Sequence, residues 1–114
     1  MRFEVRVTAG AEQDLGEIVG FLAEREGPAL AAQVLERVLE AAGQLAQHPE
    51  RGSHPKELLA LGIREFRQVI VPPYRLFYRI MDRQVFLLLV ADGRRDFQSL
   101  LERRLLQGGA RGGV

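Results

Sequence analysis

The stretch that decides the fold is residues 65–96, EFRQVIVPPYRLFYRIMDRQVFLLLVADGRRD. Three apolar runs follow one another here, over residues 65–71, 74–81 and 85–91. The corners between them are Pro72-Pro73 and Asp82-Arg83. Short runs rich in Val, Ile, Tyr and Phe with turn residues between them are typical of consecutive strands. The third run is apolar at every position, which predicts a central strand covered on both faces.

Upstream of these strands the sequence changes to helical periodicity. Residues 2–7 first alternate charged and apolar side chains, which predicts a strand with one buried face. Apolar residues then recur at helical spacing over residues 11–22 and 34–45, and Glu26-Gly27-Pro28 divides the two runs. Thr8 is a suitable N-cap for the first helix. We therefore expect two antiparallel helices joined as a hairpin.

The end of the chain completes the predicted architecture. Asp96 can cap a last helix that extends to about residue 106, and the Gly-rich residues 108–114 predict a flexible tail. The expected order is strand, helix, helix, three strands and helix within one domain, residues 1–107. This order predicts an α+β fold, in which an N-terminal helical hairpin packs on an antiparallel-rich sheet.

Composition restricts the class of protein. With 114 residues the chain can bury one hydrophobic core, and the absence of cysteine excludes disulfides and thiolate metal sites and fits a cytoplasmic protein. No apolar run is long enough to span a membrane, and the N-terminus is unlike a signal peptide. Residues 1–63 carry six basic and ten acidic side chains, whereas residues 64–114 carry ten basic and five acidic ones. The basic half could face phosphates or an acidic protein, but the net charge of +1 is low for a dedicated nucleic-acid binder.

Several local signatures occur in the order found in one toxin superfamily. The strongest is YRLFYRI at residues 74–80, which is similar to the YRIxYRI strand of that group, and DGRRD at residues 92–96 is similar to its HGRRD ending. The others are Val7-Thr8, Ala11, Asp14-Leu15 and Ile18 near the start, Leu45, Pro49 and Gly52 after the hairpin, and Leu100-Leu101 and Arg103-Arg104-Leu105-Leu106 near the end. Over residues 3–106 the chain resembles the RelE/ParE superfamily of type II toxin–antitoxin systems, in its ParE-like branch.

This resemblance implies a function as well as a fold. It implies a toxin that a cognate antitoxin, expected to be of the ribbon-helix-helix type, holds inactive. Toxins of the ParE branch bind DNA gyrase and disturb its cleavage–religation cycle without catalysing a reaction themselves. Two alternatives stay open: a ribosome-dependent mRNA endonuclease of the RelE branch, and an inactive relative that only binds its antitoxin. The weak positive charge and the missing acid–base residues favour the gyrase inhibitor.

The endonuclease alternative depends on Arg75, Glu57 and Arg94. In nuclease members an arginine at the position of Arg75 binds the scissile phosphate, a role that suits a permanently charged guanidinium. The competing interpretation is an ion pair between Arg75 and Glu57 or Glu65. Cleavage also needs a proton acceptor and a proton donor. YoeB-like nucleases place a His-Tyr pair where this chain has Gly93-Arg94, and this departure counts against ribonuclease activity.

Two surfaces are candidates for binding macromolecules. Arg94, Arg95 and Arg103 are expected to form a cationic surface that meets gyrase or its DNA, unless Arg94 and Arg95 only balance Asp92 and Asp96. Arg103 should point outward more than Arg104, because Arg104 falls one turn after the apolar Leu100. The antitoxin is expected to wrap the helical hairpin and an edge of the sheet, with an amphipathic segment in the groove between the two helices. The residues predicted to line this groove are Phe21, Leu22, Val34 and Val38.

The remaining residues predict neither a metal site nor a cofactor. His48 and His54 are the only histidines, and no acidic cluster accompanies them. His48 suits the end of the second helix, where an imidazole interacts favourably with the helix dipole. Tyr78 is expected to pack beneath a helix with its hydroxyl hydrogen-bonded.

Overall fold

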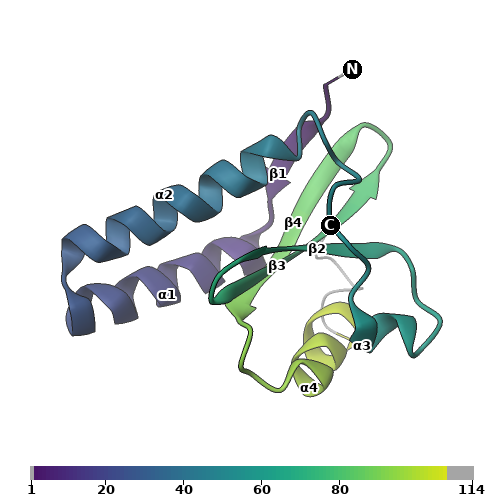
Figure 1. Cartoon of the computed structure of the whole chain (residues 1–114). Coiled ribbons are helices and arrows are strands. Elements are labelled where there is room, and N and C mark those ends of the chain that lie inside the picture. The colour runs from purple at the N-terminus through teal and green to yellow at the C-terminus, as the bar shows by residue number, and fades with distance from the viewer. Residues whose placement is uncertain (1, 108–114) are drawn as a thin grey trace.

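The computed structural model describes residues 2–107. The expected tail, residues 108–114, lies outside the described residues, as does Met1. The chain forms a four-stranded sheet with helices against both faces (Figure 1). In chain order the elements are β1 (Glu4–Val7), α1 (Ala9–Glu26), α2 (Pro28–Gln44), α3 (Lys56–Leu59), β2 (Phe66–Val71), β3 (Tyr74–Met81), β4 (Gln84–Asp92), α4 (Phe97–Leu101) and the π-helix η1 (Glu102–Gln107).

The sheet has the strand order β1-β4-β3-β2, so β4 lies between the N-terminal strand and the rest of the sheet. β3 pairs antiparallel with both β2 and β4, whereas β1 pairs parallel with β4. The predicted α+β class, the antiparallel-rich sheet and the central position of the third apolar run are confirmed. The parallel pairing of β1 is an addition that the alternation in residues 2–7 did not specify.

Apolar side chains fill the space on both sides of the sheet. The cluster beneath α1 and α2 includes Leu15, Val38, Leu76, Leu87 and Val90. The cluster on the opposite face, beneath α3 and α4, includes Leu58, Phe77, Leu89, Phe97 and Leu101. β4 contributes buried residues to both clusters, which explains why its sequence is apolar without alternation.

A bulge at Leu88 interrupts the ladder between β3 and β4. Phe77 is opposite Leu89 and Tyr78 is opposite Leu87, so Leu88 has no residue opposite it. Leu88 and Leu89 consequently pack in the same cluster, on the side of α3 and α4. A bulge of this kind twists a strand locally and takes backbone groups out of the regular ladder.

Caps and breaks occur where the sequence predicts them. The side chain of Thr8 accepts a hydrogen bond from the amide of Ala11 at 3.3 Å, and Asp96 caps α4 through the amide of Ser99 at 3.4 Å. Gly27 joins α1 to α2 with a φ of 103°, in the region that favours glycine. The hairpin therefore turns at a residue whose backbone conformation few side chains tolerate.

α3 is a helix that was not expected from the sequence. It begins at Lys56 and buries Leu58 against the sheet. Four residues make about one helical turn, too short for an apolar repeat to be visible. Within residues 2–107 no helix combines the length and the apolar character needed to cross a membrane.

Candidate functional site

Arg75 lies at the centre of a polar cluster between β2, β3 and α3. Its two terminal nitrogens donate to the carboxylate of Glu57 at 3.0 and 2.9 Å, and its Nε donates to the side-chain oxygen of Gln68 at 2.7 Å. The side chains of Arg75 and Glu57 are only 13% and 16% exposed. Of the two ion pairs expected for Arg75, the structure contains the one with Glu57.

Aromatic rings enclose the same guanidinium. Its carbon lies 4.0 Å from the ring centre of Phe97 and 4.9 Å from that of Phe77, and the two rings stack on each other. Cations are attracted to the faces of aromatic rings, most strongly where water is excluded. The pKa of Glu57 is lowered, first by its hydrogen bonds from Arg75 and against the opposing effect of burial. Glu57 is therefore a paired carboxylate that is a weak proton acceptor.

The backbone passes close to Arg75 at Gly93. The amide of Gly93 donates to the carbonyl of Pro73 at 2.7 Å. A Cβ at this glycine would lie 3.2 Å from that carbonyl oxygen and 3.6 Å from the Arg75 side chain. Gly93 is thus a tight backbone crossing, and it has no side chain that could act as an acid or a base.

Arg94, the third residue of the endonuclease hypothesis, does not join this cluster. Its side chain is 84% exposed and donates from Nε and a terminal nitrogen to Asp92 at 3.0 and 2.7 Å. The hydrogen bond from this side chain, together with one from the Arg94 amide, lowers the pKa of Asp92 to about 2. Arg75 and Glu57 are therefore paired, as one of the two interpretations predicted, whereas Arg94 is paired with Asp92.

The three arginines of the predicted cationic surface are all exposed. Arg95 and Arg103 have no carboxylate partner among residues 2–107, and Arg94 is paired only with Asp92. Arg104, in contrast, is half-buried and points inward. The expected difference between Arg103 and Arg104 is confirmed.

The predicted antitoxin groove is divided between surface and core. Phe21 is 59% exposed, with the guanidinium of Arg25 stacked 5.2 Å from its ring centre. Leu22 and Val34 are half-buried. Val38 is 1% exposed and packs in the core between α2 and the sheet, so its side chain is not available on the surface of the hairpin.

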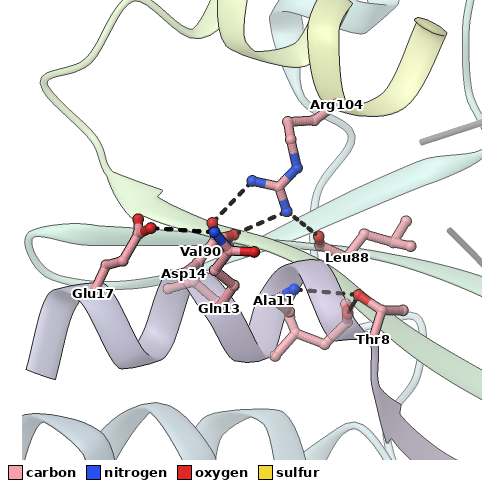
Figure 2. A network of polar contacts seen from close by, with 9 residues as sticks. Thr8, Ala11, Gln13, Asp14, Glu17, Leu88, Val90 and Arg104 are labelled. Carbon is pink, nitrogen blue, oxygen red and sulfur yellow. Dashed lines mark hydrogen bonds and ion pairs between the residues drawn. The ribbon is translucent and has the colours of Figure 1, made fainter. Parts of the chain in front are cut away.

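A second polar network, between Asp14 and Arg104, was not predicted (Figure 2). Two terminal nitrogens of Arg104 donate to the carboxylate of Asp14 at 2.9 and 3.1 Å. Asp14 also accepts a hydrogen bond from the amide of Val90 at 3.0 Å, and Arg104 donates to the carbonyl of Leu88 at 3.0 Å. Four hydrogen bonds thus join α1, β4 and η1.

This network satisfies backbone groups of β4 along the part of its edge that β1 does not cover. β1 ends at Val7, and the amide and hydroxyl of the following Thr8 both donate to the carbonyl of Leu87, at 3.1 and 2.9 Å. Beyond that point the side chains of Asp14 and Arg104 bond the amide of Val90 and the carbonyl of Leu88, which an adjacent strand would otherwise bond. Asp14 lies one turn after Ala11 on the apolar face of α1. A carboxylate on an apolar face needs a polar partner, so its position in the sequence is a signal that could have indicated this network.

Tyr78 and His54 have structural partners. The hydroxyl of Tyr78 donates to the carbonyl of Pro49 at 2.7 Å and accepts from the amide of Gly52 at 2.9 Å, which confirms the expected buried and bonded tyrosine. His54 lies with Nδ1 3.2 Å from the carbonyl of Phe66. Among residues 2–107 no group of three or more His, Cys, Asp or Glu side chains is placed to bind a metal.

Comparison with known proteins gives consistent matches. The family model described as ParE toxin of type II toxin–antitoxin system, parDE, matches residues 5–97. A chain of the chromosomal ParDE system from P. aeruginosa superposes with a TM-score of 0.67 at 17% identity, covering 80% of this chain and 96% of the other. A chain of the RelBE2 toxin–antitoxin complex from Mycobacterium tuberculosis gives a TM-score of 0.55 at 27% identity, with coverages of 81% and 99%. No curated protein sequence matches the chain.

Proposed function

Because the chain belongs to the ParE toxin family of type II toxin–antitoxin systems, we propose that it binds and inhibits DNA gyrase and that a cognate antitoxin neutralises it. The observation that carries the choice of a binding inhibitor over a nuclease is the closed pair of Arg75 and Glu57. Each has its charged atoms occupied by the other, at 3.0 and 2.9 Å.

A phosphodiester-cleaving site needs a cation free to meet the phosphorane, a base and an acid. Here Arg75 would have to leave Glu57, Gln68 and two aromatic rings before it could bind a phosphate. The lowered pKa of Glu57 makes it a poor base near neutral pH. No acid stands at Gly93. These features support a toxin that acts by binding its target and not by cleaving RNA.

The surface proposed to meet gyrase, or the DNA that gyrase holds, consists of Arg94, Arg95 and Arg103. All three are exposed, and they lie on the turn after β4 and on the helix that follows it. Loops held by a rigid sheet are common positions for recognition residues. The Arg94–Asp92 pair makes this surface less positive than three free arginines would be.

The antitoxin, proposed to be of the ribbon-helix-helix type, is placed along the helical hairpin. Phe21, Leu22 and Val34 offer the apolar contacts, and a groove of this kind accepts an amphipathic segment. Phe21→Asp and Val34→Asp should each weaken antitoxin binding in a titration while the chain stays folded. Leu61→Asp is the matched control, since Leu61 is 51% exposed and lies outside the hairpin.

The decisive assay is DNA supercoiling by purified gyrase with and without the chain. We expect supercoiling to be inhibited and the inhibition to be relieved by the antitoxin. Cleavage of an RNA oligonucleotide or of ribosome-bound mRNA that disappears in Arg75→Ala would instead support the endonuclease. A chain that binds antitoxin and does neither would be an inactive relative.

A further inference from the structure

Arg75, on β3, contacts four other segments of the chain at once. Its side chain bonds Glu57 of α3 at 3.0 and 2.9 Å and Gln68 of β2 at 2.7 Å. The guanidinium carbon lies 4.0 Å from the ring centre of Phe97, the first residue of α4. The Cγ and Cδ atoms of Arg75 lie 3.6 Å from the point that a Cβ on Gly93 would occupy. Arg75 therefore lies against both ends of the segment that leads from β4 to α4.

This joining segment, residues 93–96, has little other support. All four of its residues are exposed. The amides of Arg94 and Arg95 donate to the adjacent Asp92, and Asp96 bonds Ser99 at the start of α4. Within residues 2–107, the one hydrogen bond that ties the segment to a different part of the sheet runs from the amide of Gly93 to the carbonyl of Pro73. The position of the segment therefore depends on the packing of Arg75 and Phe97.

A guanidinium is well suited to support this segment. Its planar fork bonds Glu57 through two nitrogens while its face lies against Phe97, which a lysine ammonium could not do. Both members of the ion pair are little exposed, so water competes weakly for their charged atoms. Side chains on a loop bind a partner more tightly when the loop is already held in its bound arrangement. Arg75 supplies such a support beneath the joining segment.

We propose that Arg75 is a positioning residue for target recognition, which holds the joining segment so that Arg94 and Arg95 meet gyrase in one fixed arrangement. The inference rests on the proposed function, because it takes these two arginines as target contacts. Arg75 acts through the segment and not by touching gyrase itself, since its charged nitrogens are bonded to Glu57 and Gln68. The endonuclease hypothesis, in contrast, requires the charge of Arg75 to meet a phosphate.

Two substitutions test the contact from its two sides. Arg75→Lys keeps the positive charge and removes the planar fork, whereas Phe97→Leu keeps an apolar side chain in the core and leaves every charge unchanged. In supercoiling by purified gyrase, we expect each folded variant to need about tenfold more chain for half-inhibition. Full inhibition should still be reached at high concentration, because Arg94 and Arg95 are present. Affinity for the antitoxin should stay at the value of the parent.

Arg79 provides a matched control on the same strand. It lies two residues after Arg75 on the same face, is also half-buried, and has its guanidinium 5.7 Å from the ring centre of Phe66. This ring belongs to β2 and not to the joining segment. Arg79→Lys therefore removes an arginine–aromatic contact of the same kind, and half-inhibition should stay within about twofold of the parent.

A double variant separates positioning from direct contact with the target. If Arg75 acts through the joining segment, adding Arg75→Lys to Arg95→Ala should weaken inhibition less than it does in the parent, since the two changes affect one contact. Independent contacts with gyrase would give additive effects. Hydrogen exchange at the amides of Gly93 and Arg95 should also become faster in Arg75→Lys and stay unchanged in Arg79→Lys.

Four outcomes would overturn the inference. The first is inhibition at the parent level by folded Arg75→Lys and folded Phe97→Leu. The second is strict additivity in the double variant, which would make Arg75 a direct contact. The third is an equal loss of inhibition in Arg79→Lys, which would indicate a general effect of destabilising the sheet. In these three cases the proposed function stands. The fourth is a parent chain that does not inhibit gyrase, which would remove the proposed function as well.

Discussion

At the scale of single residues, the two charged pairs that join helices to the sheet differ from the pair on the surface. Arg75–Glu57 and Arg104–Asp14 are half-buried and each is bidentate, whereas Arg94–Asp92 is on an exposed turn. Exposed ion pairs contribute little to stability, while breaking a buried one leaves an uncompensated charge. The inner pairs should therefore govern folding, and the outer one is free to serve recognition.

Removing one partner of the Arg75–Glu57 pair should destabilise the chain more than removing both. We expect Arg75→Ala to lower the free energy of unfolding by about 2 kcal/mol, because it leaves Glu57 without its partner and removes the guanidinium that lies against the rings of Phe77 and Phe97. Urea denaturation of Arg75→Ala, Glu57→Gln and the double variant measures the coupling. Strictly additive effects would contradict a direct interaction.

The carboxyl of Asp92 should titrate far below an ordinary aspartate. Its pKa is lowered from 3.8 to about 2 by the hydrogen bonds from Arg94, so the folded state favours the charged form. The stabilisation linked to this group is complete above pH 3.8 and is lost as the pH falls toward about 2. NMR titration of the side-chain carbon should show this value in the parent and a higher one in Arg94→Ala. Equal pKa values of Asp92 in the parent and in Arg94→Ala would show that Arg94 is not the cause of the lowered pKa.

At the scale of elements, side chains complete the sheet beyond the end of β1. The bulge at Leu88 coincides with the point where β1 stops pairing, and Asp14 and Arg104 then bond the backbone of β4 (Figure 2). Gly10 leaves room for this arrangement, since a Cβ there would lie 2.7 Å from the Arg104 guanidinium. η1 is thus fixed to α1 and β4 by polar contacts, while Leu100 and Leu101 of α4 pack against the opposite face of the sheet.

Neighbouring arginines on that helix provide a matched comparison. Arg104→Ala should lower the free energy of unfolding by about 2 kcal/mol, because it removes three charge-assisted hydrogen bonds and leaves the half-buried Asp14 without its cationic partner. Arg103→Ala, at an exposed position, should change it by less than about 0.5 kcal/mol. Hydrogen exchange should show lost protection at Val90 in the first variant only. Similar effects of the two substitutions would contradict the role given to the network.

The elements also show what the sequence could and could not predict. The hairpin, its caps at Thr8 and Gly27 and the three strands after residue 65 follow local periodicity and turn chemistry, so they were predicted. The pairing of β1 with β4 and the contact of Asp14 with Arg104 join residues about 80 to 90 positions apart. No local pattern records such pairings. The bulge at Leu88 was hidden by the continuous apolar run, and Val38 was misplaced because α2 has apolar residues on more than one face.

At the scale of the whole molecule, stability and proposed activity lie in different places. Residues that hold the layers together are buried or paired, whereas Arg94, Arg95 and Arg103 extend from the C-terminal edge. The helical hairpin, proposed for the antitoxin, lies on another part of the surface. Loss of the proposed effect on gyrase should therefore leave both the fold and antitoxin binding intact.

The triple variant Arg94→Ala/Arg95→Ala/Arg103→Ala tests this separation. We expect its melting temperature and its affinity for the antitoxin to match the parent, because these side chains contribute no buried contact. Growth inhibition in cells and inhibition of supercoiling should be lost. Because the contact is electrostatic, inhibition by the parent should also weaken with added salt. A folded triple variant that stays fully toxic would move the target contact to another surface.

The central position of β4 has a consequence for how the protein is made. The ribosome releases β1, the hairpin and the β2–β3 ribbon before the strand that joins them, so a nascent chain holds two halves of a sheet with no middle. Until residue 92 has emerged, β1 has no partner and the apolar faces of α1 and α2 lack much of their support. A chain terminated early by a stalled ribosome or a premature stop codon should therefore be unfolded and degraded. Toxicity then begins only after β4 has emerged, and this delay leaves time for an antitoxin made in parallel to be present.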